Sequence, residues 1–211
     1  FEEYGIPAIG LPGTIDNDLS GTDLTIGFDT ACNTAIEAID KIRDTATSHD
    51  RLFFVEVMGR DAGFIAINAG IGSAAAAILI PERKTPIDTL IEKLKTRSKA
   101  KKSSNIVIVA EGGQSGSAQQ IADEVKTFLP HYDIKVTILG HLQRGGSPTS
   151  FDRLLASKLG VAAVEGLLQG KYDMMAGMIN NKVVYTPIVK AIVDDKEVDD
   201  EDLRIANILS T

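Results

Sequence analysis

Cysteine and tryptophan are almost absent from this sequence. Among its 211 residues there is one cysteine, Cys32, and no tryptophan. A single thiol excludes an internal disulfide framework and favours a reducing compartment, so we expect a cytoplasmic protein. Hydrophobic and charged residues, at 44% and 24%, have the proportions of an ordinary globular protein. The length suits one large domain or two small ones.

Basic residues are in the minority. There are 22 Lys and Arg against 29 Asp and Glu, which gives a formal net charge of -7. A broad positive surface for nucleic acid is therefore not expected, and nucleic acid is excluded as a partner. An anionic small-molecule substrate would have to be bound by a few local Arg and Lys side chains.

Long apolar runs are also scarce. The stretch from Ala62 to Ile80 contains no charge and approaches the length of a membrane span. It includes Asn68, Ser73 and several glycines, however, and its commonest residue is Ala rather than Leu or Phe. A small-residue helix followed by a strand at 77–80 explains it better, so we expect no membrane partner.

Strand patterns alternate with helix patterns along the chain. Buried strands are predicted at 6–11, 52–58, 77–80, 105–110, 134–139 and 175–179. Helices are predicted at 30–43, between 62 and the third strand, and at 86–99, 117–129 and 151–168, with a turn at 180–181 and a helical tail. This alternation predicts an α/β fold with one or two doubly wound, mostly parallel sheets.

Four of these strands end in loops with an unusual set of polar residues. The loops carry Thr14, Asp16 and Asp18; Gly59 and Arg60; Glu111, Gly112 and Gly113; and His141, Arg144, Gly145 and Gly146. Ligands of open α/β sheets collect where the strands end. Arg binds phosphate, Glu and His bind hydroxyls, and Gly lets the backbone approach a ligand. The set therefore predicts a site for a phosphorylated polyol.

The acidic loop after the first strand allows more than one interpretation. Asp16 and Asp18 are spaced so that one carboxylate takes a proton and the other faces a hard cation. The alternative is an Asx-rich turn whose side chains only cap backbone amides. The segment Asp16–Gly21 also matches the opening of a calcium loop, but the twelfth position is Gly27 instead of a bidentate Glu, so we discard calcium.

Arg51 and Lys135 stand where strands begin, at the opposite end of a parallel sheet from these loops. They could not readily reach the site of their own chain. They are either solvated charges, which the sequence alone favours, or contacts to phosphate in the site of a neighbouring subunit.

The polar blocks resemble the signature blocks of bacterial-type ATP-dependent 6-phosphofructokinases. They are Pro12–Asp18 (PGTIDND), Val55–Arg60 (VEVMGR), Ala110–Gly112 (AEG) and Leu139–Pro148 (LGHLQRGGSP). Their order and near-family spacing make the resemblance specific, and it runs along the whole chain. The family's opening portion, with glycine-rich loops that hold most of the nucleotide, is missing. We therefore expect a fragment that is inactive by itself.

The resemblance implies a glycolytic kinase that uses Mg²⁺ and transfers phosphoryl from ATP to the 1-hydroxyl of fructose 6-phosphate, giving fructose 1,6-bisphosphate. Asp16 would be the general base, Asp18 would lie at the magnesium ion, and Thr14 would lie near the transferring group. Arg60 would stabilise charge on the phosphates. The residues implied at the sugar phosphate are Met58, Gly59, Glu111, His141 and Arg144.

The resemblance also implies a homotetramer in which Arg51 and Lys135 act across a subunit interface. The family has Arg where this chain has Lys135, so the pair of hydrogen bonds that a guanidinium can donate to a phosphate is lost. Gly13 predicts ATP as donor, because relatives that use pyrophosphate typically carry Lys there. Cations at the family's effector site survive as Arg43 and Lys102, but its acidic position is Ala76, which predicts weak regulation.

The fold implied is two doubly wound domains of the phosphofructokinase type, with the N-terminal part of the nucleotide domain absent. Residues 1–27 and 148–190 would belong to the nucleotide domain, and 28–147 and 191–211 to the sugar-phosphate domain. Two alternatives remain: a non-catalytic sugar-phosphate-binding module and a pyrophosphate-dependent phosphofructokinase. The presence of both Asp16 and Asp18 argues against a simple binder, which needs neither a base nor a metal carboxylate.

Overall fold

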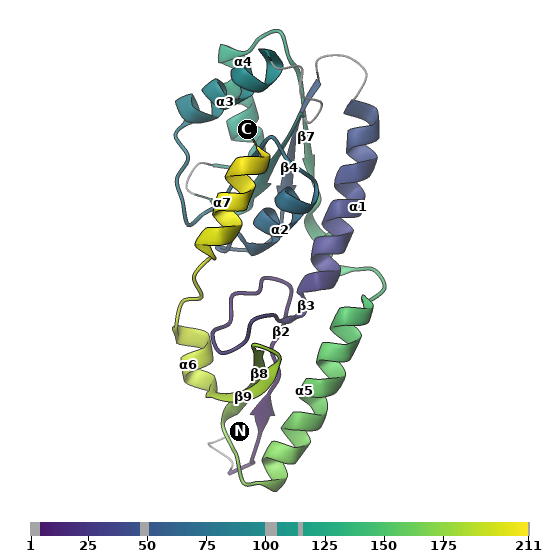
Figure 1. The fold of residues 1–211 in the computed structure, drawn as a ribbon, viewed down its shortest axis with the longest axis vertical. Helices are drawn as coiled ribbons and strands as arrows, with labels where there is room; N and C mark the ends of the chain where they lie inside the picture. Colours follow the sequence, from purple (N-terminus) through teal and green to yellow (C-terminus); the bar gives the residue numbers. More distant parts are fainter. Residues whose placement is uncertain (1–4, 47–50, 100–104, 114–115, 211) are drawn as a thin grey trace. The chain divides into compact units, whose positions relative to one another are not determined.

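The computed structural model describes residues 5–46, 51–99, 105–113 and 116–210 (Figure 1). The chain divides into two compact units, unit 1 with residues 1–30 and 147–197, and unit 2 with residues 31–146 and 198–211. Residues 191–197, which the resemblance assigns to the second part, group with unit 1. One reason is that the backbone N–H of Ser20 donates to the carbonyl of Ala191 over 3.1 Å. The nucleotide and sugar-phosphate roles of the two parts stay predictions.

Unit 2 is built on a four-stranded sheet. Its strands are β4 (Arg51–Val57), β5 (Ala77–Leu79), β6 (Ile106–Ala110) and β7 (Asp133–Ile138). They pair in the order β5-β6-β4-β7, and every pair is parallel. All residues of β6 are buried, because a parallel sheet covered on both faces needs apolar side chains on both. The predicted α/β architecture with a mostly parallel sheet is confirmed.

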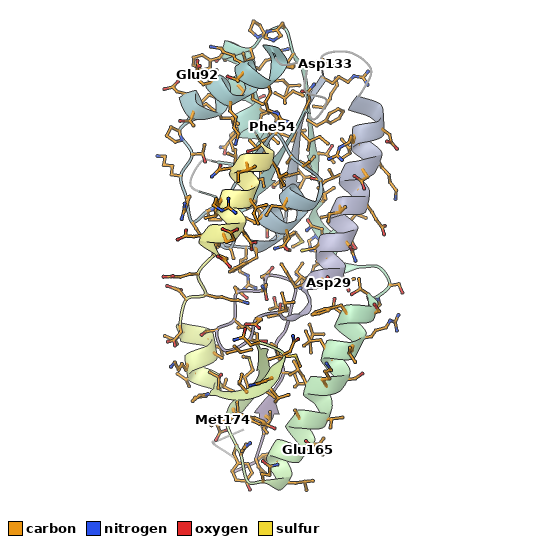
Figure 2. All side chains as sticks on the ribbon, viewed as in Figure 1. Asp29, Phe54, Glu92, Asp133, Glu165 and Met174 are labelled. Carbon is orange, nitrogen blue, oxygen red and sulfur yellow. The ribbon has the colours of Figure 1, made fainter. Side chains whose placement is uncertain are left out.

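Helices cover this sheet. They are α1 (Phe28–Ala46), α2 (Phe64–Gly72), α3 (Ile87–Lys99), α4 (Ala118–Phe128), the 3-10 helix η2 (Gly140–Arg144) and α7 (Asp200–Leu209). Side chains of α3 and α4 share one buried cluster with Leu52 and Phe54 of β4; Figure 2 labels Phe54. Helix α2 packs on β5 and β6 and lies beside α7 (Figure 1).

The uncharged stretch 62–80 forms α2 and β5, as the sequence predicts. Because α2 is short, the stretch is divided between two elements of the core of unit 2. None of the helices within the described ranges is long and apolar enough to cross a membrane.

Unit 1 contains a small mixed sheet. Its strands are β1 (Ile9–Gly10), β8 (Met174–Ile179) and β9 (Lys182–Pro187), with a separate parallel pair of β2 (Gly13–Thr14) and β3 (Ile26–Gly27). Strand β1 is parallel to β8, and β8 is antiparallel to β9. Helix α5 (Ser150–Leu168) packs on β1 and β8, and α6 (Ile188–Val193) follows β9.

Strand β9 differs from the sequence prediction, which has a helical tail after the turn at 180–181. Asn180 and Asn181 both have positive φ, at 50° and 60°. This is the backbone of a tight hairpin turn, which returns the chain along β8. The β-branched residues Val183, Val184 and Thr186 then favour a strand. The first predicted strand is also shorter than expected, because only Ile9 and Gly10 pair with β8.

Candidate active site

The acidic loop of unit 1 begins as β2 ends. The hydroxyl of Thr14 donates to Oδ2 of Asp16 over 3.2 Å, and the backbone N–H of Asp16 donates back to that hydroxyl oxygen over 3.2 Å. Asp16 and Asp18 are both half-buried. The carboxylate of Asp16 is therefore oriented by a hydroxyl that is itself fixed by the backbone, which is the arrangement that a positioned base requires.

Asn17 holds this loop in place. It is 4% exposed and has a positive φ of 58°. Its side-chain carbonyl accepts from the N–H of Thr25 over 3.0 Å, and its amide donates to the carbonyl of Asp23 over 3.3 Å. Asn17 thus bonds to backbone groups six and eight residues further along the chain, whereas the neighbouring Asp16 bonds to Thr14.

Lys196, which is close to the C-terminal end of unit 1 in the sequence, supports the same loop. Its ammonium donates to the side-chain carbonyl of Asn17 over 3.0 Å and to the backbone carbonyl of Asp23 over 2.7 Å. Burial lowers the pKa of Lys196 from 10.5 to about 8, against the opposing effect of the Asp23 and Asp18 carboxylates. The ammonium of Lys196 therefore helps to hold the loop that carries both acidic residues.

Asp152 joins the start of α5 to the end of β3 and the first turn of α1. It is 3% exposed, and its two carboxylate oxygens accept from the backbone N–H groups of Gly27 over 2.8 Å and Thr30 over 2.9 Å. The hydroxyl of Thr149 caps α5 by accepting from the N–H of Asp152. Asp152 is not among the residues predicted from the sequence, although a Thr followed three residues later by an acid is a helix-start signal that points to it.

In unit 2, hydrogen bonds hold the loop after β4 against the loop after β6. The side chain of Glu111 accepts from the backbone N–H of Gly59 over 3.3 Å and of Arg60 over 3.0 Å. Gly112 has a φ of 75°, and a Cβ on it would lie 2.4 Å from the carbonyl oxygen of Arg60. Only glycine permits this approach. Glu111, predicted to bind hydroxyls, therefore also shapes the loop that presents Arg60.

Gln143 ties the loop after β7 to the loop after β4. It is 1% exposed, and its side-chain carbonyl accepts from the backbone N–H of Met58 over 2.8 Å. Gln143 belongs to the fourth signature block, and no role is predicted for it from the sequence. Its contact fixes η2, the element that carries His141 and Arg144, against the end of β4.

Three side chains at this edge of the sheet are exposed: Arg60, His141 and Arg144. Within the described ranges, none of the three side chains forms a hydrogen bond or an ion pair. Two guanidinium groups and an imidazole without protein partners, at the ends of parallel strands, are suited to bind an anionic group of a ligand. Unit 2 thus brings together Met58, Gly59, Arg60, Glu111, His141 and Arg144.

Arg51 and Lys135 lie at the other edge of the same sheet, where β4 and β7 begin. Both contact Asp133, with Arg51 Nε 3.5 Å and Lys135 Nζ 2.9 Å from its carboxylate; Figure 2 labels Asp133. The hydrogen bond from Lys135 is the main reason why the pKa of Asp133 lies below its usual value. The sequence analysis did not foresee this shared carboxylate.

The residues named for an effector are only partly described. Arg43 donates to the carbonyl of Ser73 and lies 3.5 Å from the carboxylate of Asp40. Ala76 is buried, and its N–H donates to the carbonyl of Ile106 over 2.7 Å. Lys102 lies outside the described residues. Ala76 is the position that the resemblance assigns to the acidic residue of an effector site, and this assignment stays a prediction.

The donor groups of the acidic loop suit a magnesium ion better than a metal ion that is coordinated by protein side chains alone. Among the described residues, no three His, Cys, Asp or Glu side chains come together as a metal site. Asp16 and Asp18 offer two half-buried carboxylates. Mg²⁺ keeps several waters and binds through one or two carboxylates together with substrate phosphates, so such a donor set fits it.

Comparison with known proteins assigns the family. The sequence profile described as Phosphofructokinase matches residues 1–167. ATP-dependent 6-phosphofructokinase 2 of Bacteroides thetaiotaomicron is 54% identical over 209 residues, which are 99% of this chain and 64% of that protein. The chain thus spans about 64% of the length of that curated relative.

Solved structures agree in fold. The structure of phosphofructokinase from Saccharomyces cerevisiae is 34% identical, with a TM-score of 0.81 over 90% of this chain and 27% of that one. The pyrophosphate-dependent phosphofructokinase of Marinobacter aquaeolei is 27% identical, with a TM-score of 0.81 over 99% of this chain and 62% of that one. The chain belongs to the phosphofructokinase family.

Proposed function

We propose that this chain is part of an ATP-dependent 6-phosphofructokinase, which phosphorylates the 1-hydroxyl of fructose 6-phosphate in glycolysis. The observation that carries the proposal is the acidic loop, in which Thr14 is hydrogen-bonded to Asp16 and Asp18 stands two positions further on. A module that only binds a sugar phosphate needs neither a base nor a metal carboxylate. The 54% identity to a relative named for this activity supports the same conclusion.

Asp16 acts as the general base. Its carboxylate takes the proton of the 1-hydroxyl while that oxygen forms a bond to the terminal phosphorus of ATP, and the bond from this phosphorus to the bridging oxygen breaks to release ADP. Thr14 holds the carboxylate in position. Because phosphoryl transfer depends on in-line positioning and charge stabilisation, a base and a few cations suffice.

Charge on the phosphates is met by Arg60 and by a magnesium ion. The exposed guanidinium of Arg60 stabilises negative charge on the transferring group. Asp18 would hold the magnesium ion, which when bound supplies further positive charge at the phosphates. Lys196 and Asn17 keep this part of the loop in its conformation.

Unit 2 binds the sugar phosphate. His141 and Arg144 supply imidazole and guanidinium donors to the 6-phosphate, and Glu111 accepts from sugar hydroxyls. Met58 and Gly59 line the sugar. The hydrogen bonds between Glu111 and Gly59 and between Gln143 and Met58 support this assignment. They hold the loops after β4, β6 and β7 in fixed positions relative to one another.

ATP, and not pyrophosphate, is the donor that we propose. A Cβ on Gly13 would meet no atom within 4 Å, so the position beside the loop is open. A lysine would fit there, and its absence leaves room for the inner phosphate of a nucleotide. The relative named ATP-dependent is 54% identical, against 27% for the structure named pyrophosphate-dependent.

The proposal also includes the oligomeric state and the cellular compartment of the protein. Arg51 and Lys135 stand at the edge of the sheet away from the other sugar-phosphate residues, which supports a tetramer in which they reach the site of a neighbouring subunit. Cys32 is buried and forms no disulfide, which is compatible with the cytoplasm.

The experiment is a steady-state assay of the full-length protein that carries this chain, with fructose 6-phosphate and either ATP or pyrophosphate. The product is identified by ³¹P NMR. We expect fructose 1,6-bisphosphate to form with ATP and Mg²⁺. Binding of fructose 6-phosphate without turnover by either donor would show a binding module, and preferential turnover of pyrophosphate would show the other kinase.

A further inference from the structure

Unit 2 contains a cavity that none of the proposed catalytic or sugar-phosphate residues lines. It has a volume of about 200 Å³ and lies among β5, α3 and α7. Helix α7 presents one face to it, with Ala206 and Asn207 three and four residues after Leu203, and the C-cap residue Ser210 lines it as well. Leu79 of β5 adds to its apolar floor. Most of the lining thus comes from regular elements, and the loop between β5 and α3 adds Ile80, Arg83 and Thr85.

The rim of this cavity is polar and positively charged. Arg83, Lys93, Thr85 and Thr89 belong to its lining, and among the described residues that line it there is no Asp or Glu. The guanidinium of Arg83 is paired with Asp200, at the start of α7. One cation, Lys93, therefore remains without an opposite charge among the described residues of the cavity.

The ammonium of Lys93 is half-buried and has no hydrogen bond or ion pair within the part of the chain that the structure describes. Burial lowers its pKa, and the guanidinium of Arg97, one turn further along α3, lowers it further. Arg97 is 6% exposed, and its Nε and Nη1 atoms are buried without hydrogen-bond partners among the described residues. Two partly desolvated cations on one helix face thus have no counter-charge among the residues that the structure describes.

This arrangement is costly unless an anion completes it. A buried charge loses hydration, and two like charges one helical turn apart repel each other. An anion beside Lys93 would offset both effects. The single free ammonium favours one negative charge, and the apolar floor favours a hydrocarbon body over a strongly hydrated phosphate.

We propose that this cavity is a binding site for a small organic monocarboxylate with an apolar body. The carboxylate lies at Lys93, where the hydroxyls of Thr85 and Thr89 can donate to it, and the hydrocarbon lies against Leu79, Leu90 and Ala206. The volume is below the roughly 300–1,000 Å³ of pockets for drug-sized ligands, so the ligand is small. The proposal is independent of the kinase activity.

The test is a titration of the full-length protein with hexanoate, followed by isothermal calorimetry and by NMR of the ligand. Hexanamide is the neutral counterpart, and inorganic phosphate is the anion without an apolar body. We expect saturable hexanoate binding with a dissociation constant in the millimolar range or below, corresponding to roughly 4 kcal/mol or more. Hexanamide and phosphate should each bind at least about tenfold more weakly, in line with the loss of one charge-assisted contact or of apolar burial.

Two variants locate the site. Lys93→Met keeps the apolar stem and removes the charge, and we expect it to weaken hexanoate binding about tenfold or more. Lys95→Met is the control, because Lys95 lies on the same helix, is exposed and is 3.7 Å from Glu92, which Figure 2 labels. It should bind hexanoate like the unaltered protein. Absence of saturable binding, equal binding of hexanamide or phosphate, or full binding by the Lys93 variant would each overturn the proposal.

Discussion

Asn17→Ala should loosen the acidic loop without altering either of its carboxylates. The change removes the acceptor of the Thr25 N–H, the acceptor of the Lys196 ammonium and the donor to the Asp23 carbonyl. Thr25 is 1% exposed, so water cannot readily replace the lost partner of its N–H. The loop would then open more often, and Asp16 and Asp18 would lose their fixed positions.

The magnitude follows from two contributions. A buried N–H left without a partner costs about 1–3 kcal/mol. Alanine at the positive φ of 58° costs a further ~1 kcal/mol, which asparagine largely avoids. Together they amount to about 3 kcal/mol, which corresponds to a roughly 100-fold larger open population of the loop. Asn17→Gly should lose only the hydrogen-bond part, because glycine adopts positive φ readily.

The assay is hydrogen exchange of the Thr25 amide, measured together with kcat and with the KM for fructose 6-phosphate. We expect Thr25 to exchange about 100-fold faster in Asn17→Ala and somewhat less so in Asn17→Gly. In both variants kcat should fall more than KM rises. Asn33→Ala, an exposed position on α1, is the control and should change neither quantity. Unchanged exchange at Thr25 in Asn17→Ala would refute the role given to Asn17.

Three further predictions concern the ammonium of Lys196, the choice of phosphoryl donor, and regulation by ADP. Between pH 8 and 10.5 native Lys196 has lost a proton that the unfolded chain retains, so the free energy of unfolding should rise with pH in this window. Lys196→Met should lack this part of the rise when unfolding is measured against pH. Gly13→Lys should lower kcat/KM for ATP more than kcat/KM for pyrophosphate, because the lysine occupies open space beside the loop. With Ala76 in place of a carboxylate, ADP should shift half-saturation by fructose 6-phosphate far less than the roughly 5- to 150-fold typical of allosteric coupling, and a saturation curve with and without ADP measures this.

The sequence was sufficient to predict the sheet of unit 2 and the polar loops at its strand ends. Strand β6 is entirely apolar and buried, since both faces of the sheet are covered there, and Glu111 follows it directly. Arg60 stands three residues after the end of β4. Parallel pairing then places those ends at one edge, which is why Glu111 and Arg60 could be expected to be neighbours.

Other features depend on contacts between distant residues, which no local pattern encodes. Lys196 and Asn17 are 179 positions apart, and nothing in the acidic tail marks one lysine as the support of the loop. The carboxylate that Arg51 and Lys135 share was hidden for the same reason, because Asp133 faces Arg51 only once β7 pairs with β4. Strand β9 was missed although the turn before it was expected, because it is only six residues long and leads directly into α6.

The central claim is that Asp16 takes the proton of the sugar hydroxyl. The most direct measurement compares Asp16→Ser with the unaltered full-length protein, with kcat measured under saturating ATP and fructose 6-phosphate affinity measured by calorimetry without ATP. Asp88→Ser, an exposed carboxylate on α3, serves as the control. We expect Asp16→Ser to lower kcat by about 10²- to 10⁴-fold, the usual contribution of a positioned acid–base group, with affinity changed only a few-fold. A near-normal kcat would contradict the account and leave Asp16 as a turn residue.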